Sequence, residues 1–76
     1  MKIDLNDRLI EGIGWETSEG KSYDYIKVGE DDVDKIEANE QYLGEYSIIW
    51  LQVYKKGVLV ARYNARNVDV VWYGEV

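Results

Sequence analysis

Residues 47–73, SIIWLQVYKKGVLVARYNARNVDVVWY, limit the fold most strongly because apolar residues alternate along three short segments. The run is interrupted by Lys55-Lys56-Gly57. A glycine in third place suits a three-residue hairpin loop, since that position needs a positive φ. A loop of this length places Trp50 opposite Arg62. The pattern therefore predicts an antiparallel hairpin.

A second turn, at residues 64–67, consists of favourable turn residues and extends the hairpin to a three-stranded meander in which Asp69 faces Arg62. One face of this meander carries no charge. A one-residue slip would exchange the faces, so we assign the uncharged face to the core. The predicted core face consists of Ile49, Leu51, Val53, Leu59, Ala61, Tyr63, Val68, Val70 and Trp72.

A second hairpin is predicted from residues 9–17 and 21–28, with a loop that again ends in glycine, Gly20. A three-residue loop places Trp15 opposite Tyr23, and we favour it because it forms cross-strand aromatic pairs. A two-residue loop is the alternative and places Trp15 opposite Asp24.

Gly12 and Gly14 lie on the other face of this first strand, where they permit a bulge, a bend or a close backbone approach. We favour a structural bend over a ligand site as the reason for these glycines.

Residues 29–45 lack both alternation and a high density of β-branched residues. Asp31 or Asp32 can cap a helix, and Val33 and Ile36 stand three apart, so a short helix is predicted over residues 31–39. The expected fold is a single domain over residues 1–76. Its class is mostly β (α+β) with the order ββαβββ: an antiparallel hairpin, one short helix and a C-terminal meander.

The chain has 76 residues and neither Cys nor His. Disulfides, the usual zinc and copper sites and the common catalytic acid, base and nucleophile combinations are therefore excluded. The acidic run resembles a calcium loop at Glu30, Asp32 and Asp34, but Lys35 stands where glycine is required and Gln41 where glutamate closes the site. We expect no metal, no cofactor and no enzymatic activity.

The net charge of −6 argues against a protein that binds duplex nucleic acid. Residues 1–46 carry 13 acids and 5 bases, whereas residues 47–76 carry 2 acids and 4 bases. The acidic part either serves solubility, which we favour, or contacts a basic partner or imitates nucleic acid. Its candidate binding residues are Glu30, Asp31, Asp32, Asp34, Glu37 and Glu40. The absence of Cys and of any long apolar run predicts a cytoplasmic protein without a membrane span.

The aromatic residues are seven Tyr and three Trp with no Phe, a composition typical of interfaces. The predicted registers place Trp50, Arg62 and Asp69 side by side on the mixed face, with Tyr54 and Tyr73 as neighbours. Arg62 is expected to stack on the Trp50 ring and to pair with Asp69. This group is either a contact site for a partner or scaffold that holds the sheet face together.

The compact size and the tail GVLVARYNARNVDVVWYGE resemble the small acidic accessory proteins of phages and mobile elements. The resemblance implies a protein-binding inhibitor whose partner is a host or defence protein. The alternative is a self-assembling structural or ligand-sequestering protein that uses the same sheet face as its oligomer interface.

Overall fold

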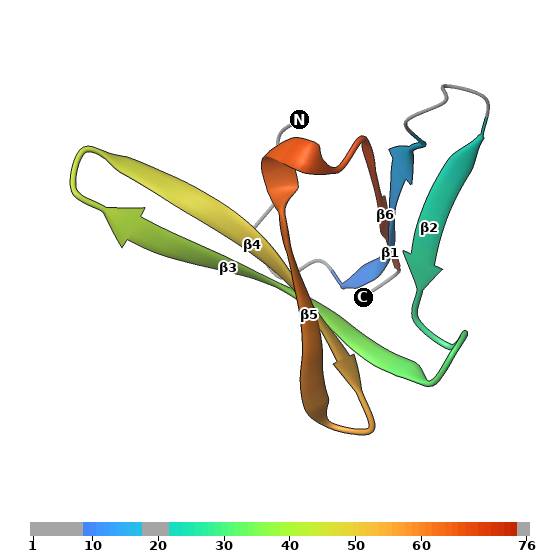
Figure 1. The fold of residues 1–76 in the computed structure, drawn as a ribbon. Helices are drawn as coiled ribbons and strands as arrows, with labels where there is room; N and C mark the ends of the chain where they lie inside the picture. The colour runs from blue at the N-terminus through green and yellow to red at the C-terminus, as the bar shows by residue number, and fades with distance from the viewer. Residues whose placement is uncertain (1–8, 18–21, 75–76) are drawn as a thin grey trace.

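The computed structural model describes residues 9–17 and 22–74, and this part of the chain is mostly β-strand, as predicted. The strands pair antiparallel throughout. In chain order (Figure 1), the elements are β1 (Ile10–Glu16), β2 (Tyr23–Lys27), β3 (Val33–Leu43), β4 (Tyr46–Lys55), β5 (Val58–Asn64), the 3-10 turn η1 (Ala65–Asn67) and β6 (Val70–Tyr73).

The six strands form one sheet of order β2-β1-β3-β4-β5, with β6 paired to β1, and this sheet folds into two three-stranded layers, β2–β1–β6 and β3–β4–β5. One residue pair, Ile10 and Ile36, joins β1 to β3 and so links the layers. Figure 1 shows that β3 and β4 run across the molecule and that β1, β2 and β6 stand to one side of them. The core between the layers consists of Ile10, Ile13, Val33, Ile36, Leu51, Val53, Ala65 and Val68.

The predicted helix at residues 31–39 is wrong, because this stretch forms the first part of β3 and pairs with β4. The register shifts between Val33 and Lys35, which makes Asp34 a bulge residue. A bulge adds one residue to the strand, so Val33 and Ile36 both face the core although they stand three apart. The spacing that suggested a helix therefore comes from a bulge in a strand. The predicted order ββαβββ is replaced by five strands, η1 and a sixth strand.

The hairpin of β4 and β5 forms as predicted, but its turn has two residues rather than three. Lys56 and Gly57 both have positive φ, 51° and 77°. The shorter turn shifts the predicted register by one residue, so Lys55 lies opposite Val58 and Tyr54 lies opposite Leu59. Farther from the turn the shift is two residues, so Trp50 lies opposite Asn64 and Arg62 lies opposite Gln52.

A further shift between Val53 and Tyr54 makes Val60 an extra residue in β5. Beyond this bulge the predicted faces are correct, since Leu51 and Val53 are fully buried. Before it the faces are exchanged, and Leu59, which was predicted in the core, is 43% exposed. The one-residue shift at the turn exchanges the faces of β5, and the bulge adds a second residue of shift that restores them.

The predicted third strand of the meander does form, as β6, but it pairs with β1 and not with β5. The turn η1, capped by the Asn64 side chain that accepts from Arg66 N at 3.0 Å, carries the chain to the other layer. Asp69 is therefore not beside Arg62, and Trp72 is 41% exposed rather than in the core.

In the N-terminal hairpin, Trp15 lies opposite Asp24. The register that we favoured is wrong, and the alternative register is the one observed; its loop, residues 18–21, lies outside the described residues. Within the described part of the chain, no helix is long and apolar enough to cross a membrane.

Candidate functional site

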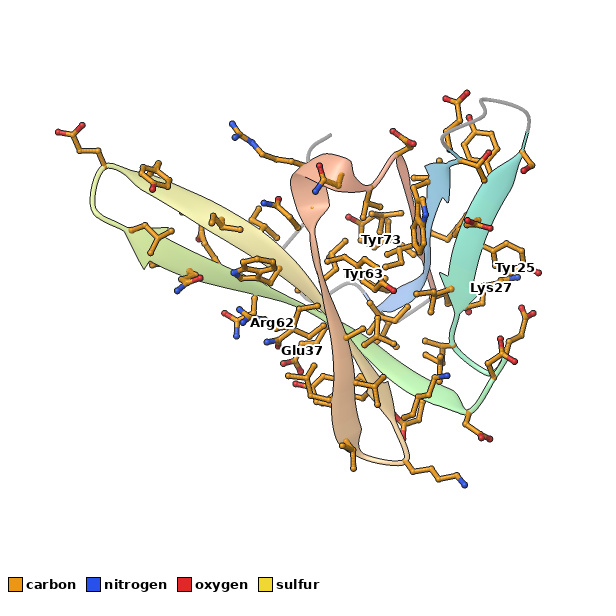
Figure 2. All side chains as sticks on the ribbon, viewed as in Figure 1. Tyr25, Lys27, Glu37, Arg62, Tyr63 and Tyr73 are labelled. Atoms are coloured by element: carbon orange, nitrogen blue, oxygen red, sulfur yellow. The ribbon has the colours of Figure 1, made fainter. Side chains whose placement is uncertain are left out.

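One side of the β3–β4–β5 layer faces away from the core, and we call it the outer face. Figure 2 shows Arg62 and Glu37 on this side, whereas Tyr63 and Tyr73 lie between the two layers. The strand registers place charged, amide and aromatic side chains of all three strands next to one another on this face. The outer face consists of Lys35, Glu37, Asn39, Gln41, Ile48, Trp50, Gln52, Tyr54, Leu59, Arg62 and Asn64.

The Trp50 ring is held on the outer face from both neighbouring strands. The guanidinium carbon of Arg62 lies 4.4 Å from the ring centroid, which confirms the predicted cation–π contact. Trp50 Nε1 donates a hydrogen bond to Gln41 Oε1 at 2.9 Å. Arg62 reaches the ring diagonally, since it lies opposite Gln52 and not opposite Trp50.

A second cation–aromatic pair stands next to the first and was not predicted. Lys35 Nζ lies 4.5 Å from the centroid of the Tyr54 ring and 3.3 Å from Glu37 Oε2. The Tyr54 hydroxyl donates to Gln52 Oε1 at 3.4 Å. Sequence reasoning missed Lys35 because the helix assignment removed its strand from the sheet.

Of the five residues predicted as a contact site, the structure brings together Trp50, Arg62 and Tyr54. Asp69 belongs to the other layer: its Oδ2 accepts from Glu16 N at 2.7 Å, and its own N donates to Gly14 O at 2.9 Å. Tyr73 pairs with Ile10 on β1 and is half-buried. The predicted ion pair between Arg62 and Asp69 is therefore wrong, because β6 does not lie beside β5.

The six predicted acidic residues are dispersed rather than clustered. Glu30, Asp31 and Asp32 are exposed in the turn between β2 and β3, and we call these three residues the acidic turn. Asp34 has a structural role, since its Oδ2 accepts from Gly57 N at 2.8 Å and so ties the β3 bulge to the β4–β5 turn. Glu37 lies on the outer face in its ion pair with Lys35.

Glu40 lies on the opposite side of β3 from Glu37, as the alternation of a strand requires. Its carboxylate accepts from the Tyr42 hydroxyl at 2.7 Å and from the Ser47 hydroxyl at 2.8 Å. These two hydrogen bonds, that from Tyr42 first, hold the pKa of Glu40 below its ordinary value. The same bond to Glu40, together with the negative charge of Glu40, raises the pKa of Tyr42.

Residues 37–49 form a projecting two-stranded hairpin that we call the arm. In this range β3 and β4 pair only with each other, because β1 contacts β3 at Ile36 and β5 contacts β4 from Trp50 onward. Figure 1 shows the arm extending away from the rest of the molecule. Two exposed aromatic residues, Tyr42 and Tyr46, lie near its tip. The arm was not predicted because its first residues were assigned to the helix over residues 31–39.

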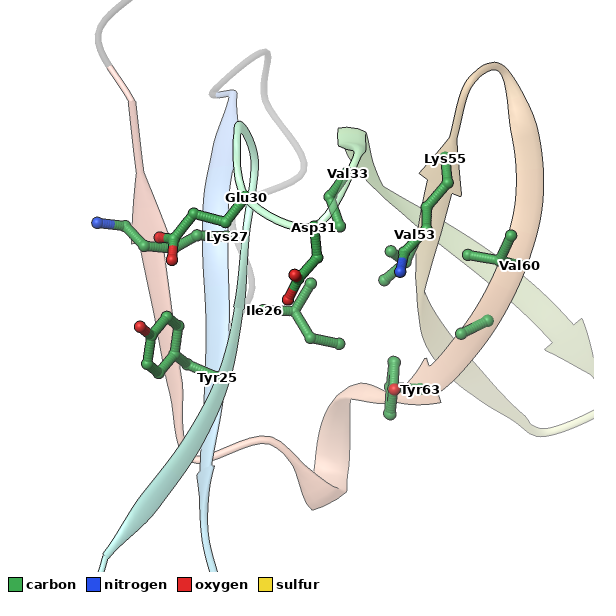
Figure 3. A pocket seen from close by; sticks show the side chains of 11 residues that line it. Tyr25, Ile26, Lys27, Glu30, Asp31, Val33, Val53, Lys55, Val60 and Tyr63 are labelled. Carbon is green, nitrogen blue, oxygen red and sulfur yellow. The ribbon is translucent and has the colours of Figure 1, made fainter.

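A cleft of about 440 Å³ separates β2 from β5. Figure 3 shows Ile26, Asp31 and Val53 projecting into it, whereas Tyr25 and Lys27 lie on the far side of β2. Its lining mixes apolar side chains, among them Ile26, Val53 and Val60, with the charged side chains of Asp31 and Lys55. Among the described residues, no group of three or more side chains could hold a metal ion.

Comparison of the chain with family models, curated proteins and solved structures finds no match. The geometry of the described residues is therefore the basis for a functional proposal.

Proposed function

We propose that the chain is a non-catalytic protein-binding module that contacts its partner through the outer face around Trp50 and Arg62. The observation that carries this proposal is the pair of cation–aromatic contacts on one exposed sheet face, Arg62 with Trp50 and Lys35 with Tyr54. As the resemblance to phage and mobile-element accessory proteins implies, we propose that this binding inhibits a host or defence protein.

Trp, Tyr and Arg are the residues that most often dominate the energy of protein interfaces. Here their rotamers are held by neighbouring side chains before any partner arrives, as in the hydrogen bond from Trp50 to Gln41. Binding then loses less side-chain entropy than it would at a mobile face. The Arg62 guanidinium forms no ion pair with any described carboxylate, so its donors are available to a partner.

The test is affinity capture from a bacterial lysate on immobilised protein, with captured proteins identified by mass spectrometry. A Trp50→Ala variant is compared with Tyr23→Ala, which removes an exposed aromatic residue from β2, away from the outer face. We expect a protein captured by the wild type and by Tyr23→Ala to be lost with Trp50→Ala. Equal capture by all three proteins would contradict the use of the outer face.

Self-assembly is the second candidate, and the arm is the observation that favours it. The arm is exposed near its tip, at Tyr42 and Tyr46, and a two-stranded hairpin is marginally stable alone, so a second copy would stabilise the arm by covering it. Light scattering after size exclusion, at micromolar and at near-millimolar concentration, tests this proposal with Tyr46→Ser as the comparison. A wild-type monomer at both concentrations would rule it out.

A further inference from the structure

The edge of β5 that faces the cleft has no strand beside it among the described residues. β5 pairs with β4 alone, and β2 stands at the other end of the strand order β2-β1-β3-β4-β5. An unpaired edge presents a row of backbone N–H and C=O groups, and another extended chain satisfies these groups best. The shape of this edge therefore favours a polypeptide strand over a small molecule.

The side chains of this edge are unusually apolar for an exposed strand. Val58 is 62% exposed and Val60 50% exposed, and Leu59 between them is also exposed. Folded proteins commonly protect such edges with charged residues or Pro. In β5, Val58, Leu59 and Val60 carry no such protection; the strand has one charged residue, Arg62, and the bulge at Val60.

The two sides of β5 differ in chemistry. Val60 and Tyr63 line the cleft, whereas Arg62 lies on the outer face. Residues 46–68, which include β4 and β5, contain four bases and no acid. A strand added here would therefore meet apolar side chains on one side and a positive charge on the other.

We propose that the free edge of β5 takes up an extended segment of a partner protein whose residues alternate between apolar and acidic. Apolar side chains of this segment pack into the cleft against Val60 and Tyr63, and a carboxylate on the other side pairs with the Arg62 guanidinium, which is already positioned on Trp50. The inference rests on the proposed protein-binding function and specifies the chemistry of the partner. A second copy of the chain fits this edge poorly, since β5 would bring no carboxylate to Arg62: residues 46–68 contain no acid.

The probe is a blocked peptide of alternating valine and glutamate about as long as β5, titrated into ¹⁵N-labelled full chain and followed by amide chemical shifts. We expect saturable shifts over β5, Val58–Asn64, at low salt. The same peptide with lysine in place of glutamate should shift these amides little. N-methylation of alternate peptide amides should abolish binding, because it removes the backbone hydrogen bonds of one edge.

Two matched variants test the role of the charge. Arg62→Gln should lower the affinity for the valine–glutamate peptide by roughly threefold to tenfold, as expected for one exposed charge-assisted contact. Arg66→Gln removes the same charge from η1, off the strand, and should change the affinity little. Each variant is accepted only if its amide spectrum in the absence of peptide remains that of a folded protein.

Three results would overturn the inference: no saturable shifts, shifts confined to the arm or to the rest of the outer face, or unchanged binding by the N-methylated peptide. A concentration-dependent dimer with broadened β5 amides would also overturn it, because a second copy would then occupy the edge. None of these results would affect the Trp50-dependent capture that tests the proposed function, so the two can fail separately.

Discussion

The indole ring of Trp72 lies against the backbone of Gly12. A Cβ atom at Gly12 would stand 2.9 Å from Cε3 of Trp72, and one at Gly14 would stand 3.0 Å from Cη2 of the same ring. The two glycines thus serve a close approach between β1 and β6, one of the alternatives predicted from the sequence. No ligand is needed to explain them.

Gly12→Ala should lower the free energy of unfolding by about 1–3 kcal/mol, the usual range for overpacking. Urea denaturation measures this change. In a Gly12→Ala, Trp72→Leu double variant, the added methyl group has more room, so the cost of the Gly12 substitution should fall. An equal cost in both backgrounds would show that the ring does not cause the strain.

Asp34→Ala should destabilise the chain by about 1–2 kcal/mol, because the Gly57 amide loses its carboxylate acceptor. Asp34→Asn keeps an acceptor oxygen and should cost less. Asp24→Ala removes an exposed acid from β2 and serves as the control for the change in net charge. Equal effects of Asp34→Ala and Asp24→Ala would contradict a specific role for this hydrogen bond.

Trp50→Ala should cost only about 1–2 kcal/mol of stability, since the ring is half-buried on the outer face and its cation–π contact contributes about 0.5–1 kcal/mol. Trp15→Ala is the comparison. Trp15 packs on the core with its ring centroid 5.2 Å from that of Tyr63, so its loss should cost about 3 kcal/mol or more. Thermal or urea unfolding of both variants decides whether the outer face is a contact surface or a second core.

The hydrogen bonds of Glu40 predict a pH dependence. The pKa of Glu40 is lowered in the folded chain, so its contribution to stability is present above the ordinary value of 4.5 and is lost as pH falls below it. The pKa of Tyr42 is raised, so its contribution is present below 10.0 and is lost as pH rises beyond that value. The difference in Tm between wild type and Tyr42→Phe should therefore be largest between these limits and shrink as pH falls through the lowered pKa of Glu40 or rises through the raised pKa of Tyr42. A difference that stays constant as pH falls from neutrality to well below 4.5 would contradict this assignment.

If the acidic turn imitates phosphates, neutralising it should abolish partner capture while leaving Tm nearly unchanged. The suitable variant is Glu30→Gln, Asp31→Asn, Asp32→Asn. Asn tolerates the positive φ of 52° at Asp31 and 63° at Asp32, so the backbone of the turn is preserved.

A control triple, Glu16→Gln, Asp24→Asn, Glu45→Gln, removes the same charge elsewhere. If partner capture survives neutralisation of the acidic turn, the turn does not contact the partner and serves solubility. Partner capture that is lost equally in both triples would indicate a general effect of net charge.

The sequence by itself determined the faces of β4, because alternation with period two assigns Leu51 and Val53 to the core whether the hairpin slips by zero or by two residues. It also determined that Arg62 meets Trp50, since a long side chain reaches a diagonal neighbour as well as a direct one. Both results concern residues close together along the chain, around one tight turn.

Only the tertiary structure decided where β3 and β6 belong. The spacing of Val33 and Ile36 fits a helix or a bulged strand equally well, and pairing with β4 along its length selects the strand. The pairing of Gly12 with Trp72 spans most of the chain, so no local turn specifies it. β6 joins β1 because Trp72 packs on the two glycines and because Ala65 and Val68 become buried in the core as the chain crosses between layers. Such burial depends on surfaces that exist only once both layers have formed, so the local alternation of apolar residues does not predict it.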